Sequence, residues 1–324
     1  MKMKTPQLLA AALVGTLALT AITSLHAEQS GSGHYMAGAV ASFIDASPGK
    51  PGWVVENIFM NYHDATFGGS RGIPIGNNIA LNLTANATAD IPLVMFSPDF
   101  QILGALPSFA VAVPYVWMDI KAGGTIDLGG VTRAVGREDK ANGIGDVEII
   151  PLLLGWTNGD IKYGALCAVY APTGEYDKSQ LANVGLGYWT FNPAISFSWL
   201  SSKIGTEVSV FTGVDFNTKN TDADYQSGDI FHIDATVAQH LPLLGGFAGV
   251  GANGFYIKQI TGDSGSGARL GSFEVETYGV GPVLSYAHKL GKHDLVCEAK
   301  WLPQLHSENT TKGDYFWVKI ALMF

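Results

Sequence analysis

The strongest constraint on this fold is an alternation of apolar and polar residues, with a period of two, that recurs in long segments. Between residues 79 and 95, one parity carries isoleucine, leucine, alanine and methionine, and the other carries asparagine, threonine and aspartate over 82–90. Successive side chains of a strand point to opposite faces, so each segment predicts a β-strand with one apolar and one polar face. Any half-solvated sheet alternates in this way, so further observations must decide what surrounds the strands.

The number of such segments and the lengths of their connections predict a closed antiparallel transmembrane β-barrel. Connections are alternately short, as at 156–160 and 288–293, and long and polar, as at 217–229. This asymmetry and an even strand number are typical of bacterial outer-membrane barrels. If residues 34–45 and a hairpin within 120–143 also crossed the membrane, the barrel would have fourteen strands instead of twelve. The twelve expected strands cover residues 53–66, 77–95, 104–120, 144–156, 160–172, 186–200, 204–217, 228–240, 246–260, 272–288, 293–306 and 313–324.

Composition supports a membrane location and excludes a nucleic-acid-binding protein. Charged residues make up 15% of the chain, against about a quarter in a typical soluble domain. After residue 27 no apolar run approaches the ~20 residues of a transmembrane helix, whereas a closed barrel satisfies every backbone group within lipid. We therefore expect the outer membrane of a Gram-negative bacterium, with its lipid and lipopolysaccharide. The formal charge of −9, without a basic run, gives no electrostatic basis for binding nucleic acid.

The amino terminus has the parts of a secretory signal peptide. A basic start precedes an apolar stretch over 8–22, and small residues before Glu28 predict cleavage there. Residues 28–52 then fit no strand pattern and end in SPGKPG. They form either a periplasmic leader or a plug in the lumen, and we favour partial insertion because twelve strands enclose more space than eight, whose side chains can fill the interior. The expected divisions are a signal peptide at 1–27, this segment at 28–52 and a barrel at 53–324.

The final stretch, GDYFWVKIALMF, has an entirely apolar parity that includes Ile320, Leu322 and Phe324. A terminal aromatic residue with apolar residues two and four positions before it predicts the assembly signal that the barrel-assembly machinery reads. The alternative is an ordinary core strand. The other strands favour the barrel.

Polar residues on the strands are the first candidates for a solute pathway. If the apolar parity faces lipid, the lumen receives Glu56 and Asp90 and most other ionisable strand residues. Charges there should be paired, hydrated or functional, so they form either an acidic constriction that disfavours anions or a structural network. His232 and Asp234 share a face; they could serve a proton relay or a metal site, but no third ligand is identifiable, and we expect a packed pair without cofactor. The polar candidates are Glu207, Asp215, His232, Asp234, Glu298 and Lys300.

The segment 144–156 provides apolar candidates. If Glu148 faces the lumen, strict alternation places Ile150, Leu152 and Leu154 there as well. Such a strip is either a track for a hydrophobic solute or the floor on which residues 35–45 pack.

Three stretches resemble one known family. They are NGIGDVEIIP at 142–151, YAPTGEYD at 170–177 with NVGLGYWTFNPAIS at 183–196, and NTKNTDADYQSGDIFHID at 217–234. The chain resembles the MetA-pathway phenol-degradation family, or SphA-like outer-membrane proteins, over roughly residues 35–324. The resemblance implies an outer-membrane β-barrel that moves aromatic or other hydrophobic compounds, without naming a substrate.

The function expected is therefore passive uptake of small hydrophobic or aromatic compounds. The alternatives are a general water-filled porin and a structural or lipid-binding barrel with a closed lumen. An enzyme is not expected, because the glycine- and serine-containing GDSGSG at 262–267 lies in a polar loop without the strand–turn–helix context of a nucleophile elbow.

Overall fold

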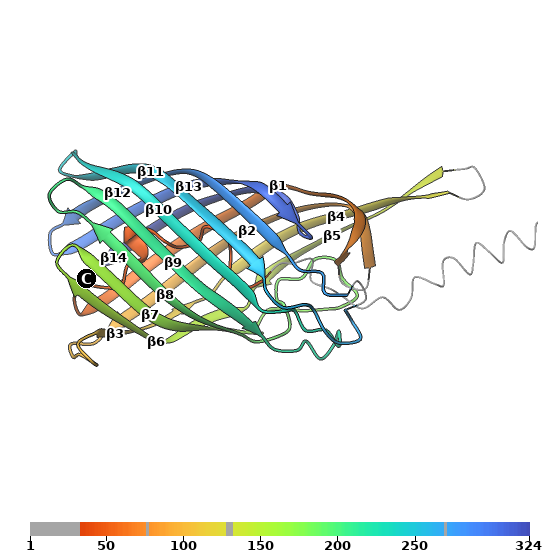
Figure 1. Ribbon diagram of the computed structural model, residues 1–324, viewed down its shortest axis with the longest axis horizontal. Helices are drawn as coiled ribbons and strands as arrows, with labels where there is room; N and C mark the ends of the chain where they lie inside the picture. Colours follow the sequence, from red (N-terminus) through yellow and green to blue (C-terminus); the bar gives the residue numbers. More distant parts are fainter. Residues whose placement is uncertain (1–32, 76–77, 128–131, 269–270) are drawn as a thin grey trace, which may run out of the picture.

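The computed structural model describes residues 33–324 apart from 76–77, 128–131 and 269–270, and it forms an elongated barrel of tilted strands (Figure 1). The expected signal peptide lies outside the described residues. The strands named in the described part of the chain are β1 (Gly52–Ile75), β2 (Asn78–Ser97), β3 (Leu106–Ala112), β4 (Tyr115–Asp127), β5 (Thr132–Ile144), β6 (Val147–Asn158), β7 (Ile161–Ala171), β8 (Thr190–Leu200), β9 (Thr206–Asn217), β10 (Ile230–Leu243), β11 (Gly246–Gln259), β12 (Glu276–Leu290), β13 (His293–Glu308) and β14 (Lys312–Met323).

Two pairs of these strands are halves of single wall strands, so the barrel has twelve strands around its circumference. Only Val113 and Pro114 separate β3 from β4, and only Gly145 and Asp146 separate β5 from β6. One end of β2 pairs with β3 and the other with β4, while β3 pairs with β6 and β4 with β5. Pro114 has no amide hydrogen, which interrupts the ladder. The fourteen-strand alternative is wrong, because residues 34–45 form no strand and the β4–β5 hairpin continues existing wall strands.

The first and last strands close the barrel. β1 pairs with β14 on one side and with β2 on the other, all antiparallel. Trp53 and Phe324 exchange two backbone hydrogen bonds, of 2.7 and 2.9 Å. The remaining neighbours from β6 to β14 pair in sequence order.

The outer surface is apolar along most of the wall, which confirms an outer-membrane β-barrel. In β8, Phe191, Ile195 and Phe197 are 43%, 60% and 42% exposed. They alternate with Asn192 and Ala194, whose side chains are buried inside. An outward apolar band with aromatic residues is the surface that lipid requires. The final strand follows the same rule: Ile320 and Phe324 are outward and exposed, and Leu322 shares their parity.

The two ends of the barrel differ. Short turns join β6 to β7, β10 to β11 and β12 to β13 at the end that carries the carboxyl terminus (Figure 1). Gly159 and Gly245 provide the left-handed conformation that two of these turns require, with φ of 61° and 78°. The β4–β5 hairpin projects from the opposite end, beyond the neighbouring strands (Figure 1).

One side of β5 has no strand partner among the described residues. β7 ends at Ala171, which pairs with Val147 at the start of β6, so no strand continues alongside β5. The connection between β7 and β8 lies there instead. The Arg137 guanidinium donates to the Ser179 carbonyl at 3.0 Å, and the Leu181 amide donates to Asp139 at 2.8 Å.

Residues 33–51, called the N-terminal segment below, run through the interior of the barrel (Figure 1). Their regular structure is a single turn of 3-10 helix, η1 (Phe43–Asp45). No helix in the described residues is both long and apolar enough to cross a membrane.

Candidate solute cavity

The N-terminal segment binds to the polar wall formed by β9, β10, β13 and β14. The Tyr35 hydroxyl donates to the Asp234 carboxylate, and the Gly38 amide donates to the same carboxylate at 3.2 Å. The Tyr35 ring stacks on His232, with centroids 3.5 Å apart. At the other end of the segment, the Phe43 amide donates to Glu207 at 2.7 Å.

Two buried lysines hold the middle of the segment from β13 and β14. Lys300 donates to the carbonyls of Gly38 and Val40 at 3.2 and 3.0 Å. Lys319 forms an ion pair with Asp45 of the segment. Glu298 lies between both lysines, 3.2 Å from Lys300 and 3.8 Å from Lys319, so their charges are compensated within the wall.

The polar candidates from the sequence therefore meet at the N-terminal segment. Glu207, His232, Asp234, Glu298 and Lys300 are all at most 3% exposed and surround it. Asp215 is also buried and accepts a hydrogen bond from Asn192.

His232 and Asp234 do not bond to each other. His232 is within hydrogen-bonding distance of Asn192, at 2.6 Å, and Asp234 accepts from Tyr35. The described residues contain no group of three or more His, Cys, Asp or Glu side chains placed to hold a metal ion. The observed partners therefore support a structural role for this polar wall.

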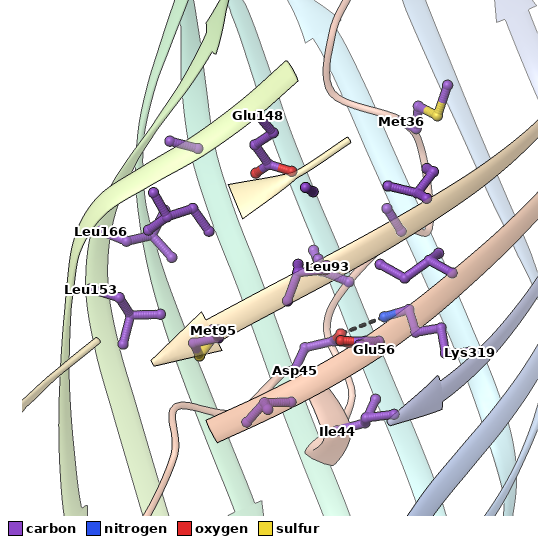
Figure 2. A pocket seen from close by; sticks show the side chains of 18 of the residues that line it. Met36, Ile44, Asp45, Glu56, Leu93, Met95, Glu148, Leu153, Leu166 and Lys319 are labelled. Atoms are coloured by element: carbon purple, nitrogen blue, oxygen red, sulfur yellow. Dashed lines mark hydrogen bonds and ion pairs between the residues drawn. The ribbon is translucent and has the colours of Figure 1, made fainter. Parts of the chain in front are cut away.

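The opposite wall leaves a cavity of about 610 Å³ beside the segment (Figure 2). Its lining extends from Pro114, Asp146 and Leu186 near the breaks in the wall strands to Val54 and Met323 at the end with short turns. Between these ends the wall is mostly apolar. The apolar lining residues of β1 to β7 include Ile58, Ala89, Ile91, Leu93, Met95, Val116, Met118, Ile150, Leu153 and Leu166.

The expectation for 144–156 is half right. Glu148 and Ile150 line the cavity, but Leu152 and Leu154 do not, and Leu152 is 38% exposed on the outside. Leu153 lines the cavity instead. Ile149 pairs with Val169 of β7, and Leu153 pairs with Leu166. β6 therefore advances four residues where β7 advances three, which is a β-bulge. One extra residue reverses the side-chain parity beyond it.

The expected orientation of 79–95 is wrong. Leu93 and Met95 line the cavity, whereas Val94 and Phe96 are 44% and 37% exposed. Asp90 shares the outward parity, where it accepts a hydrogen bond from Asn57 on β1 at 2.7 Å. Alternation shows that the two faces differ without showing which is inside. Sequence reasoning thus missed the floor of the cavity, although the apolar stripe itself was visible.

Asp146 joins three parts of the structure at the upper end of the cavity, which is the end near the breaks in the wall strands. Its carboxylate accepts from the amides of Gly174 and Leu186, at 2.9 and 2.6 Å, in the connection that follows β7. It is also 2.9 Å from His34 of the N-terminal segment. His34 in turn is 2.7 Å from the Thr190 hydroxyl of β8. The break between β5 and β6 is therefore tied to the adjacent loop and to the segment.

Residues 68–320 match the family described as the putative MetA-pathway of phenol degradation. The chain belongs to this family. No curated protein matches the chain. Among solved structures, this family member is similar to the COG4313 outer membrane channel from Pseudomonas putida F1, with a TM-score of 0.57 and 12% identity over 86% of this chain and 99% of that chain.

Two further solved barrels are similar at lower scores. The beta domain of the Bordetella autotransporter BrkA has a TM-score of 0.45 and 11% identity over 85% of this chain and 100% of its own. A Pseudomonas aeruginosa FadL homologue has a TM-score of 0.43 and 7% identity over 85% of this chain and 90% of its own.

Proposed function

We propose that this phenol-degradation family member is an outer-membrane channel for the passive uptake of small hydrophobic compounds, aromatic ones among them. The observation that carries the proposal is the apolar cavity of about 610 Å³ whose lining reaches from the breaks in the wall to the end with short turns. Such a surface favours an apolar solute by about 25 cal/mol for each Å² removed from water. The family description and the similar fold of a protein described as an outer membrane channel support the proposal.

The proposed entry is the wall beside β5, where a loop takes the place of a strand. Pro114, Asp146 and Val184 line the cavity at this level. A hydrophobic solute concentrated in the outer leaflet could reach the cavity here without first dissolving in water. The N-terminal segment occupies part of the lumen, where the wall binds it, which argues against a general water-filled porin.

Two adjacent residues on opposite faces of β2 test the proposal. Leu93→Ser makes the cavity floor polar, whereas Val94→Ser makes the same type of change on the outer surface. We expect the uptake of a radiolabelled alkylbenzene into proteoliposomes to fall several-fold for Leu93→Ser and to stay near wild type for Val94→Ser. Equal uptake by both variants and wild type would contradict the proposed pathway. Rapid liposome swelling with sugars would support the porin instead.

A further inference from the structure

Glu148 is a carboxylate of the cavity that forms no ion pair with a described residue. Its side chain projects from β6 into the cavity (Figure 2). The Tyr170 hydroxyl hydrogen-bonds to it from β7. No lysine, arginine or histidine nitrogen of the described residues lies within 4 Å of this carboxylate, whereas Lys319 is paired at the opposite side of the cavity.

The position of Glu148 is defined by one row of paired residues across the wall. Glu56 pairs with Leu93, Leu93 with Ala112, and Ala112 with Glu148. Neighbouring strands are ~4.8 Å apart, so the backbones of Glu56 and Glu148 lie about 14 Å apart along the wall. Leu93 and Ala112 form an apolar floor between them.

The two ends of this row differ in charge. Glu56 is 9% exposed and its Oε1 has no hydrogen-bond partner, but it shares its end of the cavity with the Asp45–Lys319 ion pair (Figure 2). Glu148 has Tyr170 beside it, and Tyr170 is stacked on His34 of the segment with centroids 5.0 Å apart. A carboxylate has about four lone-pair sites, so one bond from Tyr170 leaves acceptor capacity facing the cavity.

We propose that Glu148 selects solutes whose apolar body ends in a hydrogen-bond donor, a hydroxyl or an ammonium group, and disfavours solutes that end in a carboxylate. This inference rests on the proposed function and names the chemistry of its solute. The donor end binds at Glu148, near the upper end of the cavity, and the apolar body lies over Leu93 and Leu153. A carboxylate in the same place would meet a like charge in a mostly apolar site, with no described lysine, arginine or histidine nitrogen within 4 Å of Glu148.

The test uses three ligands with the same chain: octylamine, 1-octanol and octanoate. Each competes with a neutral naphthalene dye for the full barrel in nanodiscs at pH 8, with empty nanodiscs as the blank. Hydrogen bonds to a charged group correspond to about tenfold or more in affinity. We expect octylamine and octanol to displace the dye from wild type at concentrations at least about tenfold lower than octanoate.

Variants at Glu148 separate the two kinds of donor. Glu148→Gln keeps an acceptor oxygen and removes the charge, so it should weaken octylamine about tenfold and octanol by only about a few-fold. Glu148→Leu should weaken both. Loss of octanol binding in Glu148→Leu with no octylamine effect in Glu148→Gln would identify the neutral hydroxyl as the donor. Glu308→Gln, the same change at an exposed position on the rim, is the matched control.

The outcomes distinguish this inference from the proposed function. If the dye shows no saturable binding to folded wild type above the empty-nanodisc blank, the cavity is not a solute site and both proposals fail. If octanoate binds as tightly as octylamine and octanol in wild type and in Glu148→Gln, the cavity binds apolar solutes and the selection by Glu148 is refuted. A heat-dependent gel shift establishes that each variant is folded.

Discussion

A single methyl group at Gly38 should release the N-terminal segment from the barrel wall. Gly38 has a φ of +77°, and an added Cβ would overlap the Leu302 side chain, which is 0% exposed. The left-handed conformation costs an L-residue about 1–2 kcal/mol, and overpacking costs about 1–3 kcal/mol. Gly38→Ala should therefore weaken docking by about 2–5 kcal/mol, or about 30-fold to several thousand-fold.

Single-channel recording in planar bilayers measures this effect directly. Gly38 also provides the amide for Asp234 and a carbonyl for Lys300, so a displaced Gly38 loses contacts to both β10 and β13. Wild type should show a narrow conductance. In Gly38→Ala the ratio of wide to narrow open time should rise at least about 30-fold, following the lower bound of the lost docking energy.

Gly159→Ala is the matched control. Gly159 also has a positive φ, of 61°, but no atom lies within 4 Å of an added Cβ. This variant carries the conformational cost without a steric overlap, and its conductance should equal that of wild type. Identical records for Gly38→Ala, Gly159→Ala and wild type would refute the docking argument. Cleavage of residues 33–51 by protease in folded Gly38→Ala would independently show release.

Two further predictions concern the outer face and an exposed loop. Leu152→Asp places a charge on the lipid face, so the folded fraction in a gel-shift assay should fall. The barrels that do fold should bind the dye as wild type does. Loss of dye binding by folded barrels would put Leu152 in the cavity. Hydrogen bonds from Lys219 and Ser266 lower the pKa of Asp224, in the loop after β9, below its ordinary value. The stabilising contribution of Asp224 is therefore present above about pH 4 and is lost as pH falls through its folded pKa. Amide hydrogen exchange in residues 218–227 should increase only on acidification below about pH 4. Exchange that stays unchanged below this pH would contradict the argument.

Sequence patterns were sufficient for the wall wherever one face is clearly apolar. The alternation in β8 and β14 gives the correct strands and the correct outward residues, such as Phe191 and Ile320. The long polar connections and short turns also give the correct strand number. These features are local, so they can be read from neighbouring residues.

The cavity could not be read in the same way, because two of its features depend on register. The bulge after Ile149 moves Leu153 inside and Leu152 outside, and it is defined only by pairing with β7. The orientation of β2 depends on which of two partly apolar faces meets the N-terminal segment and the cavity. Contacts such as that between Lys300 and Gly38 join residues 262 apart in sequence, and no local pattern specifies them.

The division of the lumen follows from the irregular backbone of the N-terminal segment. A chain without strand partners must satisfy its amide and carbonyl groups elsewhere, and Glu207, Asp234, Lys300 and Trp317 bond to them from the wall. The ionisable residues of that wall are thereby committed to holding the segment. The remaining wall carries mostly apolar side chains with no backbone to satisfy, so it is the surface that is free for a hydrophobic solute. Glu148 lies on that surface without an ion pair, which is the basis for proposing its carboxylate as the polar contact of a solute.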